Sequence, residues 1–299
     1  MNVFKINKCP LCGKDQFESV MTCKDHYATG EPFEICRCRT CGFLFTQSVP
    51  AENEIGRYYE SPDYISHTDT HKGLMNRVYH YVRRYMLGRK SRLIKHSCGL
   101  SRGYLLDIGT GTGYFPHFMQ KKDWRVSAIE KSPQARAFAK EHFGLDIDTP
   151  ETLGTYPDKS FDAITLWHVM EHLEHLNETW ETLGRILKDR GVLIIAVPNA
   201  DSFDAQKYKE MWAAYDVPRH LWHFTPSTMQ QFGAKHGFIL TQRRPMPFDA
   251  FYVSMLTEKY KKTPCYVLKG MITGAKAWAA SLAKKDRSSS MIYVFRKKQ

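Results

Sequence analysis

The stretch that decides the fold is Leu105-Leu106-Asp107-Ile108-Gly109-Thr110-Gly111-Thr112-Gly113. It reads as a short buried strand, a glycine loop and the start of a helix. Glycines let a backbone pass close to a ligand, and a helix N-terminus favours negative charge. A dinucleotide fold would need Gly-x-Gly-x-x-Gly, but here the third glycine comes one residue early. Asp107 would also repel a phosphate, so this loop favours a ligand that carries positive charge.

Apolar runs and helical stretches alternate on both sides of this loop. Such alternation with buried-type strands predicts an α/β domain with a parallel sheet covered on both faces. The predicted strands are Tyr104–Ile108, Arg125–Glu130, Leu145–Ile147, Phe161–Trp167, Val192–Val197, Phe238–Arg243 and Met291–Phe295. The predicted helices are Leu74–His96, Tyr114–Lys122, Pro133–Phe143, His175–Lys188 and Pro226–His236, with a helical insertion at about 248–287.

The second predicted strand ends in Glu130, seventeen residues after Gly113. A carboxylate at this position can accept both hydroxyl groups of a ribose. The alternative is a solvated strand end, which the glycine loop before it disfavours.

Two matched Cys-x-x-Cys-Gly motifs stand near the N-terminus. They place Cys9, Cys12, Cys38 and Cys41 in two turns of the kind that present thiolates to zinc. The glycine after each pair permits the tight turn. Four protein thiolates leave no open position for water, so the predicted zinc is structural. Free cysteines are the alternative, but they do not explain two copies of the motif.

Charge and hydropathy exclude some classes of protein. No apolar run is long enough to span a membrane and no secretion signal is recognisable, so we expect a cytoplasmic protein. The net charge of +12 is concentrated in two segments: residues 72–102 carry nine Lys or Arg and no acid, and residues 259–299 carry eleven against Asp286 alone. These segments predict an anionic partner or, equally, solvated faces.

The motifs from Leu105 to Glu130 and from Phe161 to Leu173 resemble class I methyltransferases that depend on S-adenosylmethionine (SAM). The segments Leu193–Asn199 and Pro218–Thr225 are similar to the branch related to ubiquinone biosynthesis. The leading ribbon followed by Tyr58-Tyr59 and 63–67 resembles zinc-ribbon members of that branch. The resemblance implies a Rossmann-like, seven-stranded methyltransferase sheet with helices on both faces, preceded by a small zinc ribbon. The expected division is a ribbon at 1–50, an aromatic connector and basic helix at 51–100, and a methyltransferase domain at 101–299.

The same resemblance implies where SAM binds. Its residues would be Asp107 and the glycines Gly109, Gly111 and Gly113, with Glu130 on the ribose. Thr149 or Glu151 would contact the adenine, and His168 at the end of the fourth strand would face the cofactor.

Histidines are the candidate catalytic groups. Methyl transfer from a sulfonium needs alignment of nucleophile, methyl carbon and sulfur, and an oxygen nucleophile must also lose its proton. His168, His220 and His223 follow the strands whose carboxyl ends bind ligands in such sheets, and His220 is the first candidate for the base. Arg219, Trp222 and Phe224 would complete a pocket wall. The alternative is that these histidines satisfy backbone groups or stack.

The insertion contains a helix, 267–285, whose large apolar residues share one face: Val267, Leu268, Met271, Ile272, Trp278 and Leu282. Core packing is the favoured interpretation. The alternatives are a cap on the active site, a subunit contact, or peripheral contact with an anionic membrane.

The expected function is transfer of a methyl group from SAM to an oxygen, carbon or nitrogen atom of a small acceptor, phosphorylated or linked to a lipid or sugar. An RNA methyltransferase that holds nucleic acid with its ribbon and basic helix is the alternative, and a SAM-binding scaffold is disfavoured by the intact cofactor motif. The sequence carries no prediction of oligomeric state.

Overall fold

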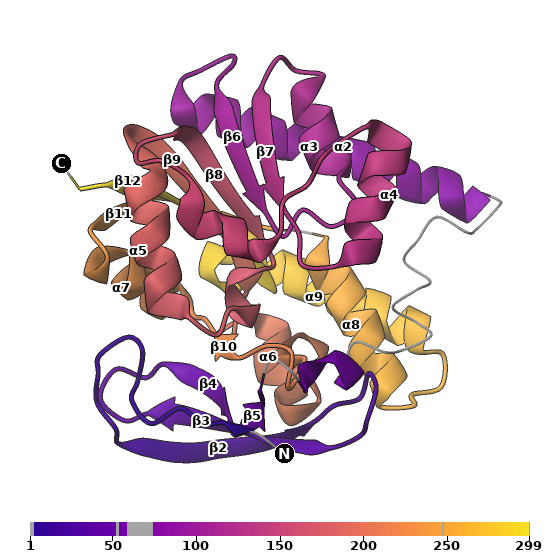
Figure 1. The fold of residues 1–299 in the computed structure, drawn as a ribbon. Helices are drawn as coiled ribbons and strands as arrows, with labels where there is room; N and C mark the ends of the chain where they lie inside the picture. The colour runs from indigo at the N-terminus through magenta and orange to yellow at the C-terminus, as the bar shows by residue number, and fades with distance from the viewer. Residues whose placement is uncertain (1–2, 52–53, 59–73, 247, 299) are drawn as a thin grey trace.

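The computed structural model describes residues 3–51, 54–58, 74–246 and 248–298 (Figure 1). Its centre is a six-stranded sheet in the order β11-β12-β9-β8-β6-β7. The strands are β6 (Tyr104–Ile108), β7 (Arg125–Ile129), β8 (Phe161–Trp167), β9 (Leu187–Pro198), β11 (Phe238–Pro245) and β12 (Ser290–Lys297). Strands β7, β6, β8 and β9 are parallel, and β12 runs antiparallel to both of its neighbours. The expected α/β class is confirmed.

Helices cover both faces of the sheet. Successive residues of a strand point to opposite faces, and apolar side chains on both faces need helices to bury them. On one face Leu106, Ile164 and Ile195 pack in a core with Trp180 and Leu183 of α5 (Leu176–Ile186). This core also contains side chains of α7 (Pro226–Lys235). On the other face, α2 (Leu74–Cys98) and α3 (Tyr114–Gln120) pack on residues that include Leu105 and Ala163. Helix α4 (Pro133–Phe143) follows β7.

The expected seventh strand is wrong in the residues that the structure describes. Residues Leu145–Ile147 form no strand. One parallel bridge, between Ile129 and Asp148, follows directly after them. The segment stays extended beside β7, and Pro150 then begins the 3-10 helix η2 (Pro150–Thr155). Proline lacks the N–H that a longer ladder would need, so the pairing ends there.

The N-terminal ribbon is joined to the catalytic domain by strand pairing. The strands β2 (Phe17–Lys24), β3 (Pro32–Cys38) and β4 (Leu44–Gln47) form an antiparallel sheet, and β10 (Trp222–His223) adds to its edge. The short strands β1 (Val3–Phe4) and β5 (Val49–Pro50) pair separately. Figure 1 shows the ribbon lying against one end of the larger sheet, with β10 and α6 (Phe203–Tyr208) between them.

The insertion forms a helical hairpin of α8 (Asp249–Tyr260) and α9 (Tyr266–Ala283). The expectation that the large apolar face of α9 packs on the core is wrong. The buried residues of α9 are small, namely Gly270, Thr273, Gly274, Ala277 and Ser281. A Cβ at Gly270 would lie 2.4 Å from the Cα of Met255, so only glycine allows this close approach of the two helices. The large apolar side chains of α9 therefore point outward.

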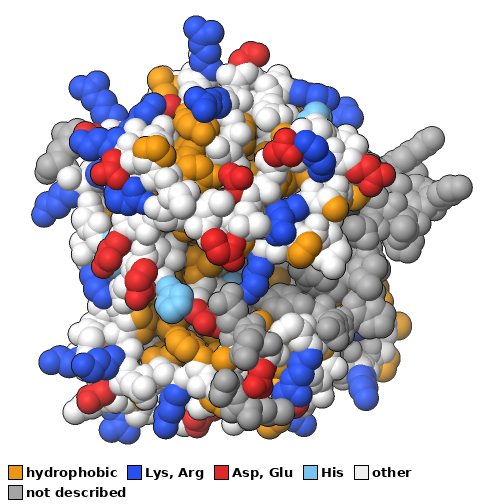
Figure 2. Space-filling model, in the orientation of Figure 1, with side chains coloured by type: hydrophobic (Ala, Val, Ile, Leu, Met, Phe, Trp, Pro, Cys, Tyr) orange, Lys and Arg blue, Asp and Glu red, His pale blue; other side chains and the backbone are white. Residues whose placement is uncertain are grey.

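Among the helices the structure describes, none is long and apolar enough to cross a membrane. The face drawn in Figure 2 carries Lys and Arg side chains spread around its edge, with Asp and Glu among them.

Candidate functional site

The glycine loop is held tightly between β7 and the end of β8. Gly109, Gly111 and Gly113 have positive φ angles of 68°, 58° and 81°, which explains the residue type at each position. A Cβ at Gly109 would lie 2.3 Å from Cγ2 of Val169. The segment after β8 therefore touches the loop directly, and ligands bound at the two places would be neighbours.

Glu130 binds the loop from its other side. Its carboxylate accepts hydrogen bonds from the backbone N–H of Gly111 at 2.7 Å and of Ser132 at 2.9 Å. A carboxylate has about four acceptor positions, so two remain for hydroxyl groups. Glu130 thus fixes the loop and still offers acceptors to a ribose.

Thr149 and Glu151 lie close to Glu130 because the backbone N–H of Glu130 donates to the carbonyl of Asp148 at 3.0 Å. Thr149 is half-buried and Glu151 is exposed. A hydrogen bond from Thr149 lowers the pKa of the Glu151 carboxyl.

Asp107 is buried beneath the loop and accepts a hydrogen bond from the Thr165 hydroxyl at 2.6 Å. Burial raises the pKa of its carboxyl to about 6, although the Thr165 hydroxyl and Lys90 oppose this shift. Lys90 on α2 has its ammonium 4.2 Å from the centroid of the Trp167 ring. Burial lowers the pKa of Lys90 to about 8 against the charges of Asp107 and Asp249. The sequence indicated a basic helix but nothing that singled out Lys90.

His168 lies between two carboxylates. Its Nδ1 is 3.3 Å from Oε1 of Glu171 and its Nε2 is 3.1 Å from Oδ2 of Asp249, the first residue of α8. Burial disfavours charge on the ring, but the hydrogen bonds to Asp249 and Glu171 outweigh burial and raise the pKa of His168 to about 10. A ring that stays protonated is a donor and has no lone pair with which to accept a proton.

Glu171, His172 and His220 form a compact cluster, with one ligand-type atom from each lying within 4.8 Å of the others. The rings of the two histidines are perpendicular, with centroids 4.5 Å apart. Burial, and then the neighbouring His220, lower the pKa of His172 to about 4, which keeps that ring neutral. The structure places His220 beside Glu171 and His172, which follow β8.

His223 faces the ribbon. Its Nε2 is 2.9 Å from Oγ1 of Thr46, whose hydroxyl donates to the carbonyl of His220 at 2.7 Å. The threonine oxygen therefore accepts from His223, which fixes the proton on Nε2. Burial lowers the pKa of His223 to about 3, so the ring stays neutral and joins β4 to β10.

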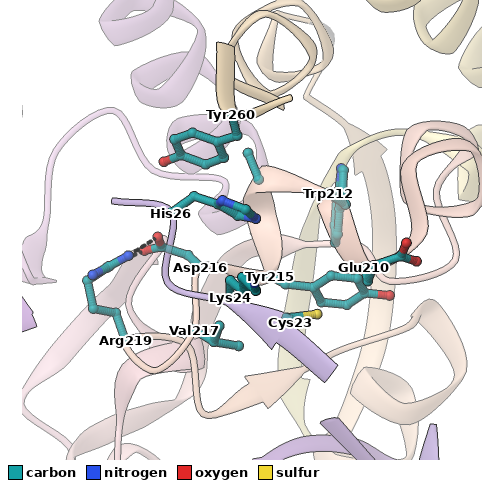
Figure 3. A pocket seen from close by; sticks show the side chains of 11 residues that line it. Cys23, Lys24, His26, Glu210, Trp212, Tyr215, Asp216, Val217, Arg219 and Tyr260 are labelled. Carbon is teal, nitrogen blue, oxygen red and sulfur yellow. Dashed lines mark hydrogen bonds and ion pairs between the residues drawn. The ribbon is translucent and has the colours of Figure 1, made fainter. Parts of the chain in front are cut away.

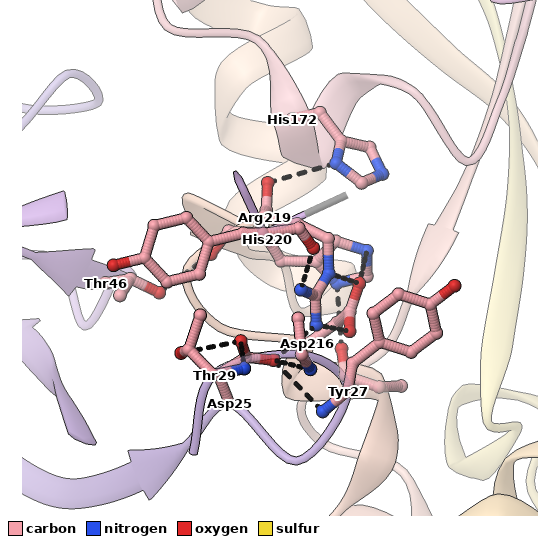
Figure 4. A network of polar contacts seen from close by, with 11 residues as sticks. Asp25, Tyr27, Thr29, Thr46, His172, Asp216, Arg219 and His220 are labelled. Atoms are coloured by element: carbon pink, nitrogen blue, oxygen red, sulfur yellow. Dashed lines mark hydrogen bonds and ion pairs between the residues drawn. The ribbon is translucent and has the colours of Figure 1, made fainter. Parts of the chain in front are cut away.

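Arg219 lines a cavity, and it also joins the ribbon to the catalytic domain (Figure 4). Its guanidinium donates to both carboxylate oxygens of Asp216, at 2.6 and 3.0 Å, and to Asp25 at 3.0 Å. Asp25 in turn accepts from the backbone N–H of Thr29 at 2.8 Å. Trp222 and Phe224 are core residues, since both are buried against Phe43.

A cavity lies on the other side of this ion pair, where the ribbon, η5 (Ala213–Tyr215) and α8 meet (Figure 3). The rings of His26 and Tyr260 stack across it with centroids 5.1 Å apart. No predicted catalytic or cofactor-binding residue lines this cavity.

The four ribbon cysteines meet as predicted. Sγ of Cys9 is 3.5 Å from Sγ of Cys41, and Sγ of Cys12 is 3.5 Å from Sγ of Cys38. Four sulfurs at about 2.3 Å from a central zinc are separated by about 3.8 Å, so the geometry fits. The glycines after each pair have φ angles of 74° and 75°, as the turn requires.

Known methyltransferases are similar to this chain in sequence. A family model described as a methyltransferase domain matches residues 78–243. An uncharacterized methyltransferase of Staphylococcus carnosus is 26% identical over 48% of this chain and 68% of its own length. The mitochondrial ubiquinone biosynthesis O-methyltransferase of Schizosaccharomyces pombe is 26% identical over 40% of this chain, but only 47% of its own length is covered.

Solved structures show the same fold at low sequence identity. The 1,6-didemethyltoxoflavin-N1-methyltransferase of Burkholderia thailandensis, with bound S-adenosylhomocysteine, superposes with a TM-score of 0.50 at 14% identity. The match covers 92% of this chain and all of that one.

Proposed function

The chain belongs to the methyltransferase-domain family and is a SAM-dependent methyltransferase, and we propose that it methylates an oxygen atom of a small, anionic acceptor. The observation that carries this proposal is the contact of Val169 with the glycine loop. Two residues further on, the buried cluster of Glu171, His172 and His220 begins. A cofactor on the loop and a hydroxyl group at the cluster would then be close enough for direct transfer.

The cofactor part of the proposal uses the residues expected from the sequence. Gly109, Gly111 and Gly113 would lie beneath the methionine and ribose portions of SAM, with Glu130 accepting from the ribose. Thr149 and Glu151 would border the adenine. Asp107 lies at the end of β6 before the loop, where it accepts a hydrogen bond from Thr165 of β8, and the Lys90 ammonium compensates its negative charge.

The acceptor part assigns different tasks to the three predicted histidines. His220 presents Nε2 to the cluster because its Nδ1 faces the carbonyl of Ala214 at 2.9 Å, so it can help to remove the hydroxyl proton. His168 is held protonated between two carboxylates and positions Glu171. His223 is a positioning residue too, since it fixes the segment that carries His220 to the ribbon.

The ribbon supports the site and takes no part in the chemistry. We propose one structural zinc on Cys9, Cys12, Cys38 and Cys41. Through the Thr46 contacts and the Arg219–Asp25 ion pair, the folded ribbon would hold the segment from Asp216 to His223 in place.

The acceptor would reach this site from a membrane surface. The outer face of α9 exposes Leu268, Ile272 and Leu282, and the exposed lysines Lys269, Lys276, Lys284 and Lys285 accompany them. Apolar side chains beside lysines match the interface of a membrane with anionic lipids. A lipid-linked or phosphorylated acceptor fits this surface.

The experiment is product capture. Purified enzyme and SAM labelled in the methyl group are incubated with lipid, metabolite and RNA fractions from a strain that lacks the gene. The strain should accumulate an acceptor that is lighter by one methylene than the wild-type compound. Transfer of label to this acceptor, if it is a small molecule or lipid, supports the proposal. Label in RNA alone contradicts it, and the RNA binding should then weaken steeply with salt.

A further inference from the structure

The cluster of Glu171, His172 and His220 has the composition of a metal site. Apart from the four ribbon cysteines, it is the only group of three or more His, Cys, Asp or Glu ligand atoms that converge within 4.8 Å among the described residues. It joins two segments distant in sequence: η3 (Met170–His172), which follows β8, and the loop before β10.

Both imidazoles are oriented with a lone pair toward the cluster. Nδ1 of His172 lies 3.0 Å from the carbonyl oxygen of Arg219, and Nδ1 of His220 lies 2.9 Å from that of Ala214. A carbonyl only accepts, so each Nδ1 carries the proton and each Nε2 carries a lone pair. Histidine ligands of metals are commonly fixed in this way, by donating the other N–H to a backbone carbonyl.

Glu171 supplies the independent observation. It is 1% exposed, and its Oε2 accepts no hydrogen bond from any residue that the structure describes. Its Oε1 is 3.3 Å from Nδ1 of His168. The positive charge of that ring is shared between Glu171 and Asp249. Buried carboxylates are paired or bind metals, because burial of an uncompensated charge is costly. A cation between Glu171 and the two lone pairs would give the free Oε2 a partner.

We propose that Glu171, His172 and His220 bind a divalent first-row transition metal ion through one carboxylate oxygen and two Nε2 atoms. Imidazole ligands select ions such as Zn²⁺, Co²⁺ or Fe²⁺ over Mg²⁺ and Ca²⁺, which prefer oxygen. Three protein ligands leave open positions, as in catalytic sites, whereas the ribbon's four thiolates close theirs.

The role of this ion rests on the proposed function. An acceptor hydroxyl on an open position would lose its proton to solvent near neutral pH, because a bound cation stabilises the alkoxide. The alkoxide oxygen would then form a bond to the methyl carbon while the carbon–sulfur bond of SAM breaks, releasing neutral S-adenosylhomocysteine. With the ion bound, Nε2 of His220 would be a ligand, and the ion would replace this histidine as the group that promotes loss of the hydroxyl proton.

Cobalt binding to the full-length enzyme tests the site without any acceptor. Protein with its ribbon zinc in place is freed of weakly held metal and titrated with Co²⁺, followed by absorption and calorimetry. We expect one Co²⁺ per chain with the weak bands of nitrogen and oxygen ligands and without the intense charge-transfer bands of thiolates. Wild-type protein that binds no Co²⁺ beyond exchange into the ribbon overturns the proposal.

Variants assign the ligands. Glu171→Gln and His220→Ala should each lower Co²⁺ affinity at least tenfold. His175→Ala is the matched control, because this histidine is exposed, close in sequence and outside the cluster. The Co²⁺ affinity of this variant should equal that of the wild type. SAM affinity, measured on the same samples, reports whether each variant is folded. A folded His220→Ala protein with wild-type Co²⁺ affinity also overturns the proposal. Cobalt binding by an enzyme that methylates only RNA would refute the proposed function and leave the metal site standing.

Discussion

Nε2 of His168, at the end of β8, lies 3.1 Å from Oδ2 of Asp249, the first residue of the insertion hairpin. Residues some eighty positions apart thus meet beside the glycine loop. The hairpin is therefore attached to the site at its first residue.

Asp249→Asn tests this attachment. The amide keeps the shape of the side chain but loses the ion pair, and both side chains are partly exposed, so we expect a loss of about 1 kcal/mol in the free energy of unfolding. Limited proteolysis should cut the α8–α9 hairpin faster. Asp189→Asn, in an exposed pair with Lys159, is the control and should leave cleavage unchanged. Equal cleavage of both variants would contradict a role for Asp249 in holding the hairpin.

Gly109→Ala should destabilise the protein more than Gly111→Ala. Both glycines have positive φ, which costs alanine about 1 kcal/mol in either place. Only at Gly109 does the new methyl group meet another atom, Cγ2 of Val169 at 2.3 Å, whereas nothing lies within 4 Å at Gly111. Denaturant unfolding without SAM measures the difference, which we expect to be about 1–3 kcal/mol.

Val169→Ala should rescue part of that loss. A double-mutant cycle over Gly109 and Val169 should give a favourable coupling of about 1 kcal/mol. Additive effects would mean that the loop and the segment after β8 do not press on each other.

Glu130→Gln should weaken SAM binding. Hydrogen bonds to a charged group contribute about 1.5–3 kcal/mol, so the dissociation constant should rise roughly 10–150-fold. Part of this loss reflects the loop itself, because Gly111 also donates to Glu130. Calorimetry measures the affinity, with Glu141→Gln on the exposed side of α4 as the control. Unchanged affinity in Glu130→Gln would remove this residue from the cofactor site.

The sequence predicted the parts of the fold that depend on local pattern. The glycine loop and β6, β8 and α4 agree with their predicted ranges because each is a short apolar run or helix with clear end signals, such as Ser132 before Pro133. The four cysteines also lie together as predicted, because the Cys-x-x-Cys spacing alone places two thiolates in position for one metal ion.

Contacts between distant segments escaped sequence analysis. Nothing near Asp249 indicates that it meets His168, and nothing near Arg219 points to Asp25. The buried face of helix α9 was predicted wrongly for a physical reason. The hydrophobic pattern locates the face with the large apolar side chains, but the face with Gly270 and Gly274 can pack closer to α8. Small residues at helical spacing were the missed signal.

Loss of the ribbon zinc should damage the site at a distance. Freshly purified protein should contain at least one zinc per chain, and the Cys9→Ser/Cys38→Ser variant should lose one equivalent by elemental analysis. Because Thr46 and Asp25 hold the segment that carries His220, turnover should fall more than SAM affinity does. Zinc retained by the double variant, or full turnover without zinc, would refute this link.

Helix α9 should bind anionic vesicles through its outer face. Leu268 and Leu282 are 63% and 67% exposed, so replacing both with glutamate costs little folding energy while removing apolar contact and adding repulsion. Burying a leucine contributes about 1.5–3 kcal/mol, and each lysine near an anionic surface adds about 1 kcal/mol. We therefore expect at least a tenfold loss of sedimentation with phosphatidylglycerol vesicles and weak binding of either protein to neutral vesicles. Ile239→Glu, half exposed on β11, is the matched control and should bind like the wild type. The contrary outcome is a wild type that fails to bind vesicles and forms dimers that Leu268→Glu/Leu282→Glu disrupts. In that case the outer face of α9 is a dimer interface, and the membrane proposal is wrong.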